Sequence, residues 1–134
     1  MSASNYLENA LVGHIFLGAA YAMPTELHVA LFTTLPDEDN AGGVEPAAAS
    51  YARVQCGPGS SYWSAPNAGD GAVTNLHAIT FPSPTEDWGE IIGFGIYDEN
   101  GNLLFVNQLA ASKEVLSGNP APEFNPGALR IIIS

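Results

Sequence analysis

The feature that most constrains the fold of this chain is a β-hairpin signal in its second half. Two apolar-rich runs, 91–98 and 103–107, flank the sequence Glu99-Asn100-Gly101-Asn102. Asn-Gly is the strongest short-range hairpin signal, because both residues tolerate the positive φ angles of a tight turn between antiparallel strands. The chain is therefore predicted to contain an antiparallel strand pair, and its other segments should be compatible with a sheet.

Four other segments have the pattern of strands, namely 27–34, 51–56, 73–81 and 128–134. Both faces of 27–34 are largely apolar, so we expect this strand to be buried. The 14 Gly and 10 Pro residues fall between the apolar runs, which is typical of a β-rich fold. No strand alternates with a helix as in a parallel sheet. The sequence therefore predicts a mainly β protein, an antiparallel β-sandwich or jelly-roll-like barrel.

One helix is predicted at the N-terminal end, over residues 5–17. Ser4 and Asn5 are suitable capping residues, and Glu8 follows Asn5 at the spacing of a capping box. Apolar side chains then recur at helical spacing, and Gly18 provides a stop signal. The apolar positions of this stripe are Leu7, Leu11 and Ile15. The helix should either pack on its own sheet or dock on a neighbouring subunit, and periodicity does not separate these two cases.

The length of 134 residues predicts one β-rich domain over residues 1–134. Two long loops are expected within it, at about 36–50 and 57–72, because both stretches lack a periodic apolar face. Loops of this length in a compact domain are usually functional or form interfaces. Tyr62 and Trp63 lie in the second loop, where an aromatic ring could anchor a protein partner, stack on a sugar or close one end of the sandwich. For Trp88 we favour a role in closing one end of the sandwich.

The charge of the chain excludes several classes of partner. Three Lys and Arg against 14 Asp and Glu give a net charge of −11. Binding to a nucleic acid backbone needs clustered basic residues, and anionic membranes repel an acidic protein. No apolar run reaches the roughly 18 residues that span a bilayer. We therefore expect no nucleic acid or membrane partner. We also expect synthesis in a cytosol, because the first residues lack the basic start of a secretory signal.

No residue pattern supports catalysis, a metal site or a cofactor. The acidic triplet at 37–39 is a weak calcium candidate, but no loop has the spacing of an EF-hand. The three histidines lack the spacing of paired zinc ligands. Gly57-Pro58-Gly59-Ser60-Ser61 does not match a nucleophile elbow, and Gly93-Phe94-Gly95 is better explained by close backbone packing. The single Cys56 is predicted to be a small core residue. Because none of these patterns supports catalysis, the sequence predicts a protein that is not an enzyme.

Several short segments together resemble a family of small virion proteins of tailed bacteriophages. These segments are Ser4-Asn5-Tyr6-Leu7-Glu8-Asn9, 27–32, Ser50-Tyr51-Ala52-Arg53-Val54, Ala78-Ile79-Thr80-Phe81-Pro82, Trp88-Gly89 and Gly93-Phe94-Gly95-Ile96-Tyr97-Asp98. The resemblance covers nearly the whole chain and departs from the family at Cys56 and Pro84. Members are commonly described as tail-fibre-like, and similar small β-rich phage proteins serve as capsid cement. The resemblance implies a structural role in the virion, with no catalytic residues to carry over.

Our main prediction for function is a capsid decoration or cement protein that binds the outside of the shell and bridges capsid subunits. The alternatives are a tail-fibre or baseplate component, or a module that binds a host surface or carbohydrate. The expected partners are the major capsid protein and further copies of the chain, in a symmetric homo-oligomer and specifically a trimer. The predicted interface residues are Leu7, Leu11, Ile15, Tyr62 and Trp63.

Overall fold

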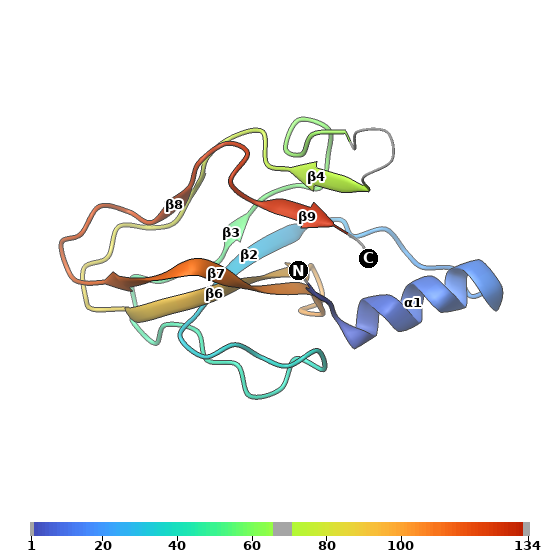
Figure 1. Cartoon of the computed structure of the whole chain (residues 1–134), viewed down its shortest axis with the longest axis horizontal. Coiled ribbons are helices and arrows are strands. Elements are labelled where there is room, and N and C mark those ends of the chain that lie inside the picture. The colour runs from blue at the N-terminus through green and yellow to red at the C-terminus, as the bar shows by residue number, and fades with distance from the viewer. Residues whose placement is uncertain (1, 66–70, 133–134) are drawn as a thin grey trace.

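A computed structural model describes residues 2–65 and 71–132 of the chain. One helix and nine strands are assigned in this part (Figure 1). In chain order they are β1 (Ser2–Ala3), α1 (Asn5–Phe16), β2 (Leu27–Phe32), β3 (Val54–Gln55), β4 (Ala72–Thr74), β5 (Ile79–Thr80), β6 (Gly89–Asp98), β7 (Leu103–Val115), β8 (Glu123–Phe124) and β9 (Arg130–Ile132).

The largest sheet has five antiparallel strands in the order β1-β7-β6-β2-β3. Its centre is the predicted hairpin of β6 and β7. The buried Asp98 carboxylate accepts hydrogen bonds from the main-chain N–H groups of Asn100 and Asn102, which fixes the turn. Strand β2 lies on the other side of β6 and pairs with it along its full length. The hairpin prediction is therefore confirmed.

Two small antiparallel sheets, β4-β9 and β5-β8, contribute to a core over one face of the large sheet (Figure 1). The alternation of β2 directs Val29 and Leu31 into this core. Ala30 and Phe32 point to the opposite face, where a second cluster forms with Tyr97 and other apolar residues. Strand β2 is therefore buried on both faces, as its sequence predicts. The antiparallel β class and the N-terminal helix are confirmed, while closure into a sandwich or barrel stays a prediction.

The predicted single strand at 73–81 is wrong. The structure divides it into β4 and β5, which belong to different sheets. Between them the buried Asn75 exchanges main-chain hydrogen bonds with Leu129 and Gly127, and residues 76–78 are exposed. Residues 73–81 do have the pattern of a strand, but within this segment the chain passes from the β4-β9 sheet to the β5-β8 sheet.

Other strand limits also differ from the predictions. Strand β7 continues past residue 107 to Val115, because its second half pairs with the start of β6 at Gly89–Ile91. The strand predicted at 51–56 is reduced to β3, and the last strand is seen as β9, with 133–134 outside the described residues. No local pattern predicts the short strands β1 and β8. Both form through pairing with distant segments rather than through local preference.

Candidate functional site

Helix α1 is anchored only at its first turn and then leaves the β-sheets (Figure 1). Its N-cap is Ser4, whose hydroxyl accepts a hydrogen bond from the N–H of Leu7 and donates one to the carbonyl of Leu103. The main-chain N–H of Ser4 also donates to the carbonyl of Leu104. The helix ends where Gly18 adopts the left-handed conformation, at φ 70°. The N-cap is thus fixed to strand β7, and the last turns extend beyond the sheets.

The predicted stripe of Leu7, Leu11 and Ile15 runs from the core into solvent. Leu7 is buried, Leu11 is half-buried, and Ile15 is 66% exposed. We use the name α1 apolar face for the large exposed apolar side chains at the far end of the helix and in the segment that follows it. It consists of Val12 (51% exposed), Ile15, Phe16 (76%), Leu17 (78%) and Met23 (83%).

The segment that follows α1 runs back beside it and covers one of its sides. The N–H of Tyr21 donates a hydrogen bond of 3.1 Å to Nδ1 of His14, and the N–H of Ala19 donates to the carbonyl of Gly13. From residue 9 to residue 25 the sequence contains no Asp, Glu, Lys or Arg, although the chain carries a net charge of −11. The α1 apolar face is therefore both exposed and free of charged side chains.

The aromatic residues of the second long loop are not equivalent. Tyr62 is exposed, whereas Trp63 is half-buried and its indole N–H donates a 3.0 Å hydrogen bond to the carbonyl of Cys56. Trp63 packs against the main core, so it differs from the loop-tip anchor that the sequence suggested. Trp88 is 4% exposed and belongs to the core, as predicted.

Trp63 lines an apolar groove of about 240 Å3, which we call the Trp63 groove. None of its lining residues within 2–65 and 71–132 is charged. Its residues come from β2, β4, β6, β7, β9 and the second long loop, and they are Leu27, Trp63, Val73, Ile96, Leu104, Phe105 and Ile131. The predicted interface residues therefore separate into two surfaces. Ile15 contributes to the helix face and Trp63 to the groove, while Tyr62 and the helix residues do not line the groove.

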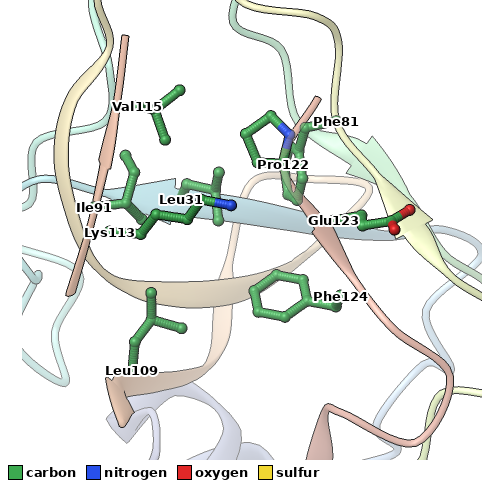
Figure 2. A pocket seen from close by; sticks show the side chains of 9 residues that line it. All are labelled: Leu31, Phe81, Ile91, Leu109, Lys113, Val115, Pro122, Glu123 and Phe124. Atoms are coloured by element: carbon green, nitrogen blue, oxygen red, sulfur yellow. The ribbon is translucent and has the colours of Figure 1, made fainter. Parts of the chain in front are cut away.

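A smaller pocket of about 80 Å3 lies between the large sheet and the β5-β8 sheet (Figure 2). Apolar residues form most of its wall. The carboxylate of Glu123 points away from it and accepts a hydrogen bond from the Thr80 hydroxyl. An apolar cavity that holds benzene has about 150 Å3, so this pocket is too small even for such a ligand. We interpret it as a packing gap rather than a binding site.

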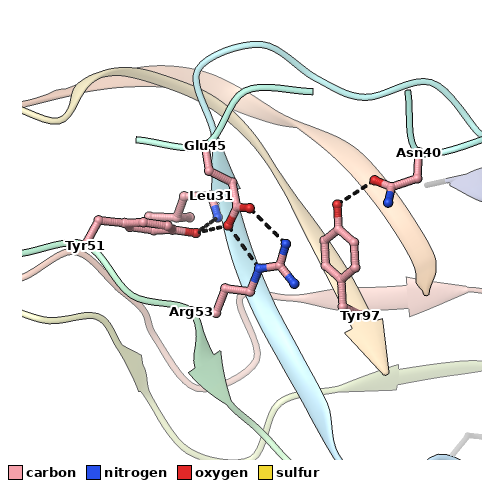
Figure 3. A network of polar contacts seen from close by, with 6 residues as sticks. All are labelled: Leu31, Asn40, Glu45, Tyr51, Arg53 and Tyr97. Atoms are coloured by element: carbon pink, nitrogen blue, oxygen red, sulfur yellow. Dashed lines mark hydrogen bonds and ion pairs between the residues drawn. The ribbon is translucent and has the colours of Figure 1, made fainter. Parts of the chain in front are cut away.

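A polar network attaches the first long loop to the large sheet (Figure 3). Arg53 makes a two-point ion pair with Glu45, with N···O distances of 3.0 and 2.8 Å, and its guanidinium lies 3.9 Å from the centre of the Tyr97 ring. The Tyr51 hydroxyl donates to Glu45 and accepts from the main-chain N–H of Leu31. Charge-assisted bonds of this kind fix a loop in position, so the network is structural.

We expect this network to make stability depend on acid pH. Burial raises the pKa of Glu45, but hydrogen bonds from Arg53 and Tyr51 outweigh burial and hold that pKa below its ordinary value. Ionised Glu45 therefore stabilises the fold at neutral pH, and this contribution is lost as the pH falls through the lowered pKa. Glu45→Gln should be less stable than wild type near neutral pH, and the difference should narrow in acid.

Urea unfolding of both proteins at a series of pH values from about 7 to about 3 checks this prediction. The exposed Glu114, changed to Gln, serves as the control carboxylate and should show no such convergence. An unchanging difference between wild type and Glu45→Gln across the series would contradict the assigned role of Glu45.

The acidic triplet at 37–39 is exposed and has a structural role in its loop. Oδ1 of Asp37 accepts hydrogen bonds from the N–H groups of Asp39 and Ala41, and Asp39 accepts one from the Asn5 side chain. Within residues 2–65 and 71–132, no group of three or more His, Cys, Asp or Glu side chains is placed to hold a metal ion. No helix in the same part of the chain is long and apolar enough to cross a membrane.

Comparison with known proteins places the chain in a family. A family model described as podophage GP4 fiber I protein gp80 matches residues 2–132. A search of curated proteins found no match. A fibre family supports the tail-fibre alternative and not the main prediction of capsid cement. The chain belongs to the family of podophage GP4 fiber I protein gp80, and it is accordingly a structural protein of the phage virion, a tail-fibre protein and not an enzyme.

Proposed function

We propose that this fibre protein is an assembly subunit, and that the α1 apolar face is the surface through which it binds a neighbouring protein of the virion. The observation that carries this proposal is the exposure of Ile15, Phe16, Leu17 and Met23 on an uncharged segment. Together with Val12, they are five large apolar side chains that are at least half exposed on one short segment of the chain. Exposed apolar surface of this kind is typical of protein interfaces.

A membrane is the other surface that an apolar helix could bind. Helices that lie on membranes usually carry Lys and Arg on their polar face, which attract anionic lipids. Residues 9–25 contain neither, and the net charge of −11 opposes approach to an anionic bilayer. The chemistry therefore favours a protein partner.

A sugar-binding role has less support. The rings that would stack on a sugar are largely covered, since Trp88 is buried and Trp63 is half-buried with its N–H already used. Only Tyr62 of these three aromatic residues is exposed. We therefore keep assembly as the single proposed function.

The test is Phe16→Asp, produced in phage and as purified protein. A charge in the centre of an apolar interface should abolish incorporation into particles, because the carboxylate would be desolvated without a partner. The purified variant should stay folded, with stability within about 0.5 kcal/mol of wild type, because Phe16 is 76% exposed. Protein content of purified particles and urea unfolding give the two measurements.

Leu116→Asp is the matched control, since Leu116 is an exposed leucine at the end of β7, outside the α1 apolar face. It should be incorporated normally. Normal incorporation of Phe16→Asp would contradict the proposal. Binding of wild-type protein to neutral lipid vesicles, lost in Phe16→Asp, would instead indicate a membrane surface.

A further inference from the structure

The Trp63 groove and the α1 apolar face are two uncharged apolar surfaces of the same chain. The groove is lined by Leu104 and Phe105 of β7, and the N-terminal segment is bonded to those same residues, through Ser4 to Leu104 and through β1 to Phe105. The helix therefore starts beside the groove. The far end of α1, which ends at Phe16, extends away from strand β7 (Figure 1).

A chain cannot fill its own groove with its own helix end. The helix has 12 residues, which corresponds to about 18 Å, and its first turn is fixed at Ser4 by hydrogen bonds to β7. Phe16 lies in the last turn, so a rigid helix holds it roughly three turns from its anchor. If a helix end of this kind fills the groove, it has to belong to another molecule.

Charge selects a second copy as a suitable occupant. Two copies with a net charge of −11 each repel one another, so they can approach closely only where their surfaces lack carboxylates. The described residues that line the groove are all uncharged, and residues 9–25 contain no Asp, Glu, Lys or Arg. These two surfaces satisfy that condition together.

Size is also compatible. The groove of about 240 Å3 exceeds the roughly 150 Å3 that holds a benzene ring, so it can take the ring of Phe16 and part of a neighbouring aliphatic side chain.

We propose that Phe16, with Ile15 beside it, inserts into the Trp63 groove of a second copy of this chain. This inference rests on the proposed function and names the partner of the α1 apolar face. Each copy has one helix end and one groove. All of them are therefore occupied only when a ring of copies closes or when two copies exchange helices. The expected trimer is one such closed arrangement, and the number of copies is measured in the test.

The test uses two purified single-cysteine additions, Phe16→Cys and Val73→Cys, mixed with a short thiol-specific cross-linker. Val73 lines the groove. The mixture should give a cross-linked dimer that each variant alone gives weakly or not at all. The native Cys56 should stay silent, because it is buried and burial raises the pKa of its thiol. A mixture of Leu116→Cys with Val73→Cys is the control and should not cross-link.

Association of the wild-type protein is measured in parallel by analytical ultracentrifugation. Salt should strengthen it, because ions screen the repulsion between acidic copies while the apolar contact persists. Phe16→Asp should weaken it by roughly 30-fold or more, as expected for a central apolar anchor.

The outcomes separate this inference from the proposed function. A wild-type protein that stays monomeric, or wild-type oligomers whose association Phe16→Asp leaves unchanged, would overturn the groove contact. If Phe16→Asp still fails to enter particles in that case, the helix binds a different virion protein and the proposed function stands. If Phe16→Asp enters particles normally, the proposed function itself fails.

Discussion

Replacing Gly93 by alanine should destabilise the protein by about 3 kcal/mol or more, because there is no space for a Cβ atom in the centre of the main sheet. A Cβ built at Gly93 would lie 2.3 Å from Cδ2 of Leu35 and 2.6 Å from the carbonyl oxygen of Asn107. The leucine side chain can move. The carbonyl belongs to β7, which pairs with β6 at this position, so the hairpin at the centre of the sheet would have to separate.

Urea unfolding of Gly93→Ala checks this expectation, with Gly13→Ala as the control. A Cβ at Gly13 would meet only Cβ of Ala19, at an ordinary distance of 3.6 Å. Alanine is also the better helix former by about 1 kcal/mol, so Gly13→Ala should leave stability unchanged or raise it. A Gly93→Ala protein with wild-type stability would show that the two strands are not packed as closely as described.

Gly93 also illustrates what local sequence can predict. The Asn-Gly turn, the two-sided burial of β2 and the close packing at Gly93 all follow from residue chemistry within a few positions. Each is confirmed by the structure. The limits of the helix are also predictable from the sequence, because Ser4 is a strong N-cap signal and Gly18 a strong stop signal.

The errors occur where distant segments determine the structure. The second half of β7 contains Ala110, Ala111 and Ser112, which have little strand preference, and an irregularity in its pairing with β6 falls at this point. Its strand conformation depends on pairing with residues 89–91. The division of 73–81 has the same origin, since Asn75 is hydrogen-bonded to Asn125 and Leu129, which lie 50 and 54 positions later.

The candidate site was predictable only in part, for a related physical reason. Helical periodicity identified Leu7, Leu11 and Ile15. It cannot show that the helix leaves the sheets after its first turns. For this reason the predicted interface residues do not include Phe16 and Leu17. The Trp63 groove brings together six separate parts of the chain. No local pattern marks such a surface. The choice between capsid and fibre likewise depended on the family match rather than on residue chemistry.

Asn75→Ala should also destabilise the protein strongly, by about 3 kcal/mol or more, because three hydrogen bonds, one buried and two partly buried, depend on one buried side chain. Asn75 is 1% exposed. Its amide group donates to the carbonyls of His77 and Asn125, at 2.9 and 3.0 Å, and its Oδ1 accepts from the N–H of Leu129 at 2.9 Å. Alanine would leave these main-chain groups unpaired, and each buried unpaired group costs about 1–3 kcal/mol.

The pattern of donors makes this prediction specific to the amide. Asn75→Asp keeps an acceptor for Leu129 but replaces the donating NH2 group by oxygen, which then faces the two carbonyl oxygens of His77 and Asn125. A buried carboxylate without a donor partner is costly, so Asn75→Asp should be at least as destabilising as Asn75→Ala at neutral pH. It should recover partly in acid, where a protonated carboxyl can donate one hydrogen bond.

Asn125→Ala, which changes only an exposed side chain and keeps the Asn125 carbonyl, is the control and should unfold like wild type. Urea unfolding of the three variants at neutral and acid pH measures these differences, and equal stability of Asn75→Ala and Asn125→Ala would contradict the role assigned to Asn75.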